Sequence, residues 1–147
     1  MQLHTFLFLS FLVTFQANSL AQGTIALTID NIATAKGSIM VAVYNSEDTF
    51  LSDDQTFTAL SEPISQKGEL TVRFKDLPYD TYTIAIFHDV NGNGELDTNL
   101  FGVPKEPYGF SNNAVSKWGP PKYEVARFDL EEAKLNMQVS VKKWGDQ

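Results

Sequence analysis

The feature that most constrains this chain is an alternation of apolar and polar side chains with a period of two residues. Successive side chains of a β-strand point to opposite faces, so this period predicts half-buried strands rather than helices. Six segments show it: residues 25–29, 39–44, 70–74, 82–87, 126–130 and 135–141. Gly, Pro, Asn and Asp separate them, which is typical of a sandwich. We therefore expect an all-β, antiparallel β-sandwich of about seven strands, with helix only as short turns near residues 46–51 or 111–116.

The first residues have a different composition. An apolar run, residues 6–15, is followed by a polar break and by the small residues Ser19 and Ala21. This order is typical of a secretory signal peptide, and the run is shorter than the about 20 apolar residues that span a bilayer. The sequence predicts a signal peptide over residues 1–21, export to the periplasm or the cell exterior, and no membrane span after cleavage.

Residues 22–147 are expected to form a single β-sandwich domain, because a chain of this length suits one hydrophobic core. The sequence contains no cysteine, so disulfides cannot support the fold, although an exported protein could form them. The core must therefore hold the domain, with or without the help of a bound ion.

The formal net charge of the chain is -7. Nucleic acids bind clustered Lys and Arg side chains, so this acidic balance disfavours nucleic acid as a partner. It argues against anionic membrane surfaces for the same reason. It fits cation binding, or simply solubility.

A run of oxygen-bearing side chains and glycines, HDVNGNGELD at residues 88–97, follows the strand expected at 82–87. Counted from its first Asp, side-chain oxygens recur at alternate positions, and a glycine stands sixth, where calcium loops bend sharply. The candidate metal ligands are the side chains of Asp89, Asn91, Asn93 and Asp97 and the backbone carbonyl of Glu95. We expect calcium as the cofactor, in a structural role.

Two observations limit this interpretation. Position 12 of the loop is Leu100 rather than a bidentate Glu, and the preceding element is a strand, so a complete EF-hand is excluded. A bare turn is the alternative, because Asn-Gly pairs favour positive φ without any metal. That alternative leaves Asp89 and Asp97 unexplained, since nearby carboxylates repel unless something positive joins them.

Residues 99–124 show no alternation and contain four of the six prolines. Loops of this length are usually functional or disordered, and their many aromatic residues disfavour disorder. Tyr108, Phe110 and Trp118 are the candidate ligand-binding residues, because exposed aromatic rings stack on sugars or clamp peptides. The alternative is a packed lid over one open end of the sandwich, since aromatic side chains are mostly buried.

Candidate catalytic groups are few. His88 is the only histidine after residue 21, and without cysteine a zinc site lacks ligands. We expect His88 to end a layer of the core and to hydrogen-bond locally. Ser111 sits in a segment that begins like a nucleophile elbow, but Asn113 replaces the final glycine. A small hydrolase that uses Ser111, His88 and a carboxylate is the alternative function.

Three segments resemble a bacterial family known as domain of unknown function 2141: GSIMVAVYNSEDTFL (37–51), VRFKDLPYDTYTIAIFHDVNGNGELDTNLFGVPKEPYGFSNNA (72–114) and GPPKYEVARFDL (119–130). The resemblance implies an exported protein without an established activity. Asp80 departs from the pattern, because a glycine usually precedes the Thr-Tyr pair. The segment FKDLPYDTYTIAIF (74–87) is also similar to prealbumin-like and carboxypeptidase-regulatory-like sandwiches, which implies fold only.

We therefore expect an exported, non-enzymatic, immunoglobulin-like module. It would bind an unidentified small molecule, glycan or protein through residues 99–124 and hold calcium at Asp89–Asp97. A purely structural or assembly domain with an inert loop stays open as a further alternative.

Overall fold

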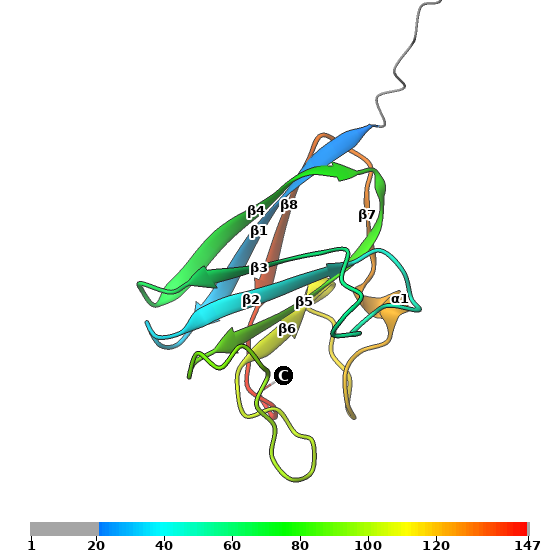
Figure 1. Cartoon of the computed structure of the whole chain (residues 1–147). Coiled ribbons are helices and arrows are strands. Elements are labelled where there is room, and N and C mark those ends of the chain that lie inside the picture. Colours follow the sequence, from blue (N-terminus) through cyan, green and yellow to red (C-terminus); the bar gives the residue numbers. More distant parts are fainter. Residues whose placement is uncertain (1–20, 147) are drawn as a thin grey trace, which may run out of the picture.

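The computed structural model describes residues 21–146, which form two facing β-sheets (Figure 1). One sheet has the strand order β4-β1-β8, and the other has the order β3-β2-β5-β6 with β7 paired to β5. The strands are β1 (Gln22–Ile32), β2 (Ser38–Tyr44), β3 (Thr58–Pro63), β4 (Gly68–Pro78), β5 (Asp80–Asp89), β6 (Tyr108–Phe110), β7 (Phe128–Leu130) and β8 (Lys134–Ser140). The all-β sandwich is confirmed, with eight strands. The predicted signal peptide lies almost entirely outside the described residues.

The core lies between the two sheets and consists of the alternating apolar residues that the sequence predicts. In the central strands β1, β2 and β5, nine of the predicted alternating side chains are at most 2% exposed: Ile25, Leu27, Ile29, Ile39, Val41, Val43, Tyr82, Ile84 and Ile86. Burial of side chains of this size stabilises the fold by about 1.5–3 kcal/mol each. The opposite face of the second sheet does not contact the first sheet and is therefore free to carry a site.

One pairing departs from the expected antiparallel pattern. β8 runs parallel to β1, in a register from Thr24 opposite Lys134 to Asp30 opposite Ser140. Parallel neighbours require a long crossover connection. Here the connection includes all strands of the second sheet, which come between β1 and β8 in the sequence. The chain returns to the first sheet at the end where β1 begins, and β8 starts there.

Two strands were not predicted from the alternation. β3 has the sequence TALSEP, is exposed at most positions, and ends at a proline, as an edge strand tolerates. β6 has three residues, which is too short to show a period, and lies within the segment 99–124.

The strand predicted over residues 126–130 is partly wrong. Helix α1 (Tyr123–Ala126) takes its first residue, and only its last three residues form a strand, β7. The 3-10 helix η1 (Ser111–Asn113) falls within one of the predicted short helical turns. Residues 47–51 form hydrogen-bonded turns rather than a helix.

The chain crosses between the sheets at one residue, Tyr79, which lies between β4 and β5. The left-handed residue of this crossover is Asp76, with φ 57°, and not Asp80. The Tyr82 hydroxyl donates a hydrogen bond of 2.8 Å to the Pro78 carbonyl and so fixes the corner. Burial of the ring, with the Asp80 carboxylate as a smaller cause, raises the pKa of Tyr82 above its ordinary 10.0.

Candidate functional site

The acidic loop wraps its backbone around the carboxylate of Asp89, the last residue of β5. The side chain is 3% exposed. Its Oδ1 accepts the N–H groups of Gly92 (2.7 Å) and Asn93 (3.2 Å), and its Oδ2 accepts that of Gly94 (2.8 Å). Gly92 and Gly94 have φ of 76° and 81°, a region that glycine enters at little cost. Both glycines are therefore required by the bend that brings these donors together.

Asp97 closes the same loop through side-chain amides. Nδ2 of Asn91 donates to its Oδ2 at 2.6 Å, and Nδ2 of Asn93 donates to its Oδ1 at 3.2 Å. The Oδ1 atoms of the two asparagines accept the backbone N–H groups of Asn93 (3.1 Å) and Glu95 (3.0 Å). The structure thus brings Asp89, Asn91, Asn93 and Asp97 into one turn, and leaves the Glu95 side chain exposed.

The hydrogen bonds leave part of the oxygen capacity unused. An ionised carboxylate offers about four lone-pair sites and an amide oxygen two. By this count, Asp97 keeps two sites, and Asp89, Asn91 and Asn93 keep one each. In the described part of the chain, the only ion pair is Arg127 with Glu124, so neither loop carboxylate is neutralised by a base. Among the same residues, no three His, Cys, Asp or Glu side chains are grouped to hold a metal, so a cation here depends on the two amides.

Glu106 is a residue of this site that the sequence analysis did not single out. Its carboxylate is 6% exposed and accepts the N–H groups of Val90 (2.8 Å) and Asp97 (3.2 Å). Glu106, two residues before β6, therefore holds the two ends of the acidic loop together. A signal exists in the sequence, since Glu106 is the only acidic residue between positions 98 and 123.

The three candidate ligand-binding aromatics have different environments. Tyr108 and Phe110 on β6 are 7% exposed and pack in a second apolar cluster with Ala114 and Ala126. Trp118 is 85% exposed. Tyr108 and Phe110 are therefore packed and Trp118 is not, while ligand binding by all three stays a prediction.

An open groove of about 1430 Å³ runs across the outer face of the second sheet. Its floor is a row of paired small residues on three neighbouring strands, Ala59, Ala42 and Ala85. Its walls come from the acidic loop, the segment 101–104, Trp118 and Trp144. Burial raises the pKa of Tyr44 and Tyr108, which also line it, above 10.0, and the Asp53 carboxylate adds to this for Tyr44. Both hydroxyls therefore stay protonated at neutral pH.

The residues of the hydrolase alternative do not meet. Ser111 is fully buried; its hydroxyl accepts the Ile84 N–H at 2.9 Å and lies 2.5 Å from the Ala126 carbonyl, to which it donates. His88 is also fully buried, as expected, but Nε2 lies 2.7 Å from the carbonyl of the distant Lys36. Ile84 and His88 are four residues apart on β5, about 13 Å along a strand. Ser111 has neither a base within reach nor access to solvent.

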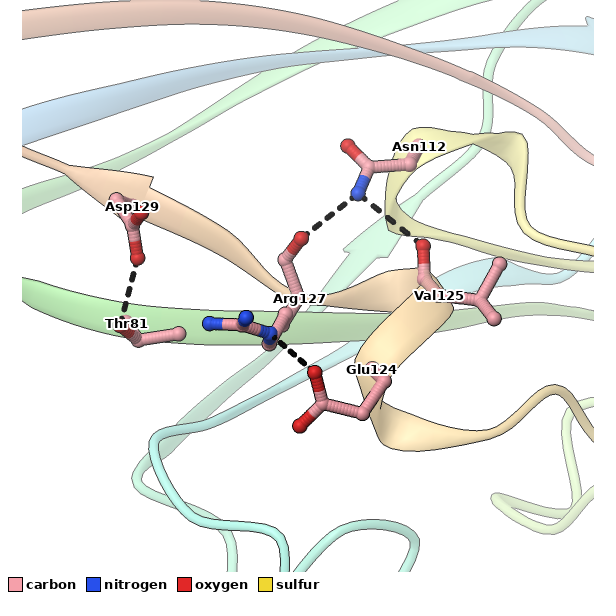
Figure 2. Close-up of polar contacts among 6 residues, drawn as sticks. All are labelled: Thr81, Asn112, Glu124, Val125, Arg127 and Asp129. Atoms are coloured by element: carbon pink, nitrogen blue, oxygen red, sulfur yellow. Dashed lines mark hydrogen bonds and ion pairs between the residues drawn. The ribbon is translucent and has the colours of Figure 1, made fainter.

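Ser111 and its two neighbours instead join three parts of the fold. Figure 2 shows the Asn112 amide donating to the carbonyls of Val125 (3.3 Å) and Arg127 (2.8 Å), beside the Arg127–Glu124 ion pair. Asn113 accepts the Ser140 N–H at 2.8 Å and donates to the Gln138 carbonyl at 3.3 Å. The segment SNN therefore holds β5, α1 and β8 together.

The geometry defines a two-sheet β-sandwich that carries an acidic, hydrogen-bonded loop beside an open groove. The sequence profile of a family described as an uncharacterized protein conserved in bacteria, DUF2141, matches residues 27–138, and the chain belongs to this family. The resemblance found in the sequence is thereby confirmed. No curated protein and no solved structure matches the chain. Within residues 21–146, no helix has the length and apolar content needed to cross a bilayer.

Proposed function

We propose that this protein is an exported, non-enzymatic binding module that holds a ligand in the groove of its second sheet. The observation that carries the proposal is the groove itself, with the ring of Trp118 standing 85% exposed at its wall. A large aromatic side chain left in water in an otherwise well-packed domain favours a binding role.

The groove lining indicates the class of ligand. Its charged side chains are Asp53 and Glu95, and none of its residues is Lys or Arg. An anionic ligand would be repelled, whereas sugar hydroxyls can donate to carboxylates and sugar rings stack on indole faces. We therefore propose an uncharged glycan that lies along the alanine floor.

Calcium is proposed to bind the acidic loop. The ion would replace the Asn91 and Asn93 amides as the partner of the Asp97 carboxylate, and would use the oxygen sites that the hydrogen bonds leave free. Gly94, Glu95 and Leu96 line the groove, so an ion that fixes the loop also fixes one wall. Extracellular calcium modules have dissociation constants of about 0.1–1 mM, which is the range we expect.

Intrinsic fluorescence offers a direct test, because the chain has two tryptophans and both Trp118 and Trp144 line the groove. Titration with neutral oligosaccharides should quench or shift the emission, and calcium should tighten the binding. Trp144→Phe leaves Trp118 as the single reporter and should keep the response. Trp118→Ala should abolish it. A panel of neutral oligosaccharides that leaves the emission unchanged with and without calcium would remove the glycan proposal.

Export is proposed on the apolar run and the small residues before Gln22. N-terminal sequencing of protein from a bacterial host should return Gln22. A chain that begins at Met1 in that host contradicts it.

A further inference from the structure

The acidic loop contains the only two Asn-Gly pairs of the chain, Asn91-Gly92 and Asn93-Gly94. All four residues are exposed. An asparagine loses its side-chain amide when the backbone nitrogen of the next residue attacks Cγ and closes a cyclic imide. Glycine has no Cβ to obstruct this attack, and its backbone adapts to the ring. Sequence and exposure together make both asparagines candidates for deamidation.

The loop orders the side-chain amides for this reaction. Oδ1 of Asn91 accepts the Asn93 N–H at 3.1 Å, and Oδ1 of Asn93 accepts the Glu95 N–H at 3.0 Å. Each amide is thereby folded back over the peptide of the glycine that follows it. Negative charge develops on Oδ1 when Cγ is attacked, and a backbone N–H that already points at this oxygen stabilises that charge.

The carboxylate of Asp89 contacts the nitrogens that attack. Its Oδ1 accepts the Gly92 N–H at 2.7 Å, and its Oδ2 accepts the Gly94 N–H at 2.8 Å. Each nitrogen must lose this proton when it attacks, and a carboxylate within hydrogen-bond reach of the proton can act as the general base. One buried side chain therefore serves both Asn-Gly pairs.

Asp97 contacts the groups that leave. Nδ2 of Asn91 and Nδ2 of Asn93 each donate to one of its carboxylate oxygens. Deamidation replaces the amide by an acid that is ionised at neutral pH, so a donor is lost and a second carboxylate faces Asp97. Like charges at such a short distance repel. Each event would thus open the loop at Asp97 and add one negative charge to the formal -7 of the chain.

We propose that the acidic loop catalyses its own deamidation at Asn91 and Asn93. The glycine nitrogen gives its proton to Asp89 while its bond to Cγ forms. The bond from Cγ to Nδ2 then breaks, and the proton passes through water to the departing group, which leaves as ammonia. Water hydrolyses the imide to aspartate or to its β-linked isomer, so no oxidant, reductant or cofactor is needed.

This modification does not rest on the proposed calcium site, but its consequence deepens that proposal. Calcium affinity rises with the number of charged ligands in a loop. Asn91 and Asn93 are neutral ligands before the reaction and carboxylates after it. Deamidation would therefore convert a loop that is held by its own hydrogen bonds into one that depends on a cation.

Peptide mass spectrometry of the protein during incubation with chelator at neutral pH tests the proposal. Asn91 and Asn93 should exchange their amides for acids, whereas Asn99 should not. The rate in folded protein should equal or exceed the rate in urea, because only the folded loop places Asp89 and the N–H donors. Reaction no faster than at Asn99, or faster in urea than in folded protein, would overturn the proposal.

Asn99 also offers a matched control for the role of Asp89. It is exposed and its Oδ1 accepts the Phe101 N–H at 2.8 Å, but Leu100 follows it. Leu100→Gly gives it the following glycine without the carboxylate, because the three N–H groups that Asp89 accepts belong to residues 92–94. In this variant Asn99 should react at least about tenfold more slowly than the two loop asparagines. Equal rates would show that turn and glycine suffice, and would overturn the catalytic role.

Two substitutions at Asn93 test the site and its consequence. Asn93→Gln lengthens the side chain, so the imide ring cannot close there, and only Asn91 should react. Asn93→Asp reproduces one product and should melt at a lower temperature than the wild type in chelator, because it faces Asp97 with a charge. Equal melting would contradict the opening of the loop. A protein that deamidates and shows no calcium shift in either form would remove the calcium site and leave the deamidation standing.

Discussion

Two asparagine-rich turns of this protein use the same side chains in opposite ways. In residues 111–113 the side chains bond to backbone atoms of β5, α1 and β8. In residues 91–97 every side-chain bond of the asparagines stays within the loop. The first turn therefore belongs to the fold as a whole. The side-chain bonds of the second hold only the loop itself, which is why we propose that a ligand can replace them.

The largest expected effect is at Ser111. Ser111→Ala leaves the buried Ile84 N–H and Ala126 carbonyl without this partner, and each such group costs about 1–3 kcal/mol. We expect a loss of about 2–4 kcal/mol in the free energy of unfolding, measured in urea. Ser116→Ala is the control, because that hydroxyl is exposed and bonds within its own loop. Equal losses in both variants would break the comparison.

Asn113 should come next. Asn113→Gly keeps the left-handed backbone, which has φ 49°, and removes only the side chain that holds Ser140 and Gln138 of β8. Two exposed hydrogen bonds at about 0.5–1.5 kcal/mol each predict a loss of about 1–2 kcal/mol. The corresponding Asn93→Gly in the acidic loop should change the stability of calcium-free protein by less than about 0.5 kcal/mol. A larger loss of stability in Asn93→Gly than in Asn113→Gly would show that the acidic loop, and not the 111–113 turn, supports the fold.

The Tyr82 hydroxyl differs from both turns, because it bonds to a carbonyl only four residues away and yet belongs to a buried side chain. The pKa of this hydroxyl is raised in the folded state. The protonated hydroxyl therefore contributes fully to the free energy of unfolding below the unfolded-state pKa of 10.0, and this contribution is lost as the pH rises through the folded-state pKa. Tyr82→Phe should cost about 0.5–1.5 kcal/mol at neutral pH. As the pH rises above 10.0, the wild-type protein should lose more stability than Tyr82→Phe, as unfolding curves measured at increasing pH will show. Parallel pH profiles for the two proteins would contradict this assignment.

Trp118 should have the smallest effect on stability. Trp118→Ala removes an 85% exposed ring, so the free energy of unfolding should change by less than about 0.5 kcal/mol. A packed Trp would cost about 3–5 kcal/mol. A loss of that size in urea would show that the ring is buried in solution.

The same contrast explains what the sequence could predict. The spacing of Asp89, Asn91, Asn93 and Asp97 predicted one turn because their contacts are local, and alternation predicted the core strands. The sequence offered Ser111 only as a possible nucleophile and missed its structural role, because its partners lie 15 and 27 residues away. The parallel pairing of β8 likewise depends on a crossover through the other sheet rather than on any local pattern.

The central claim is that the acidic loop binds calcium, and thermal melting tests it most directly. Between excess chelator and about 10 mM calcium, binding at the expected affinity adds about 1.4–2.7 kcal/mol, which should raise the melting temperature by several degrees. Asp97→Asn should lose the shift, since it removes the charge while keeping one of the two acceptor oxygens that the Asn91 and Asn93 amides use. Magnesium should substitute poorly. Asp89 is a poor test site because its carboxylate already orders three N–H groups. A wild-type melting temperature that is equal in chelator and calcium, or an equal rise in Asp97→Asn, would contradict the claim and leave a bare turn.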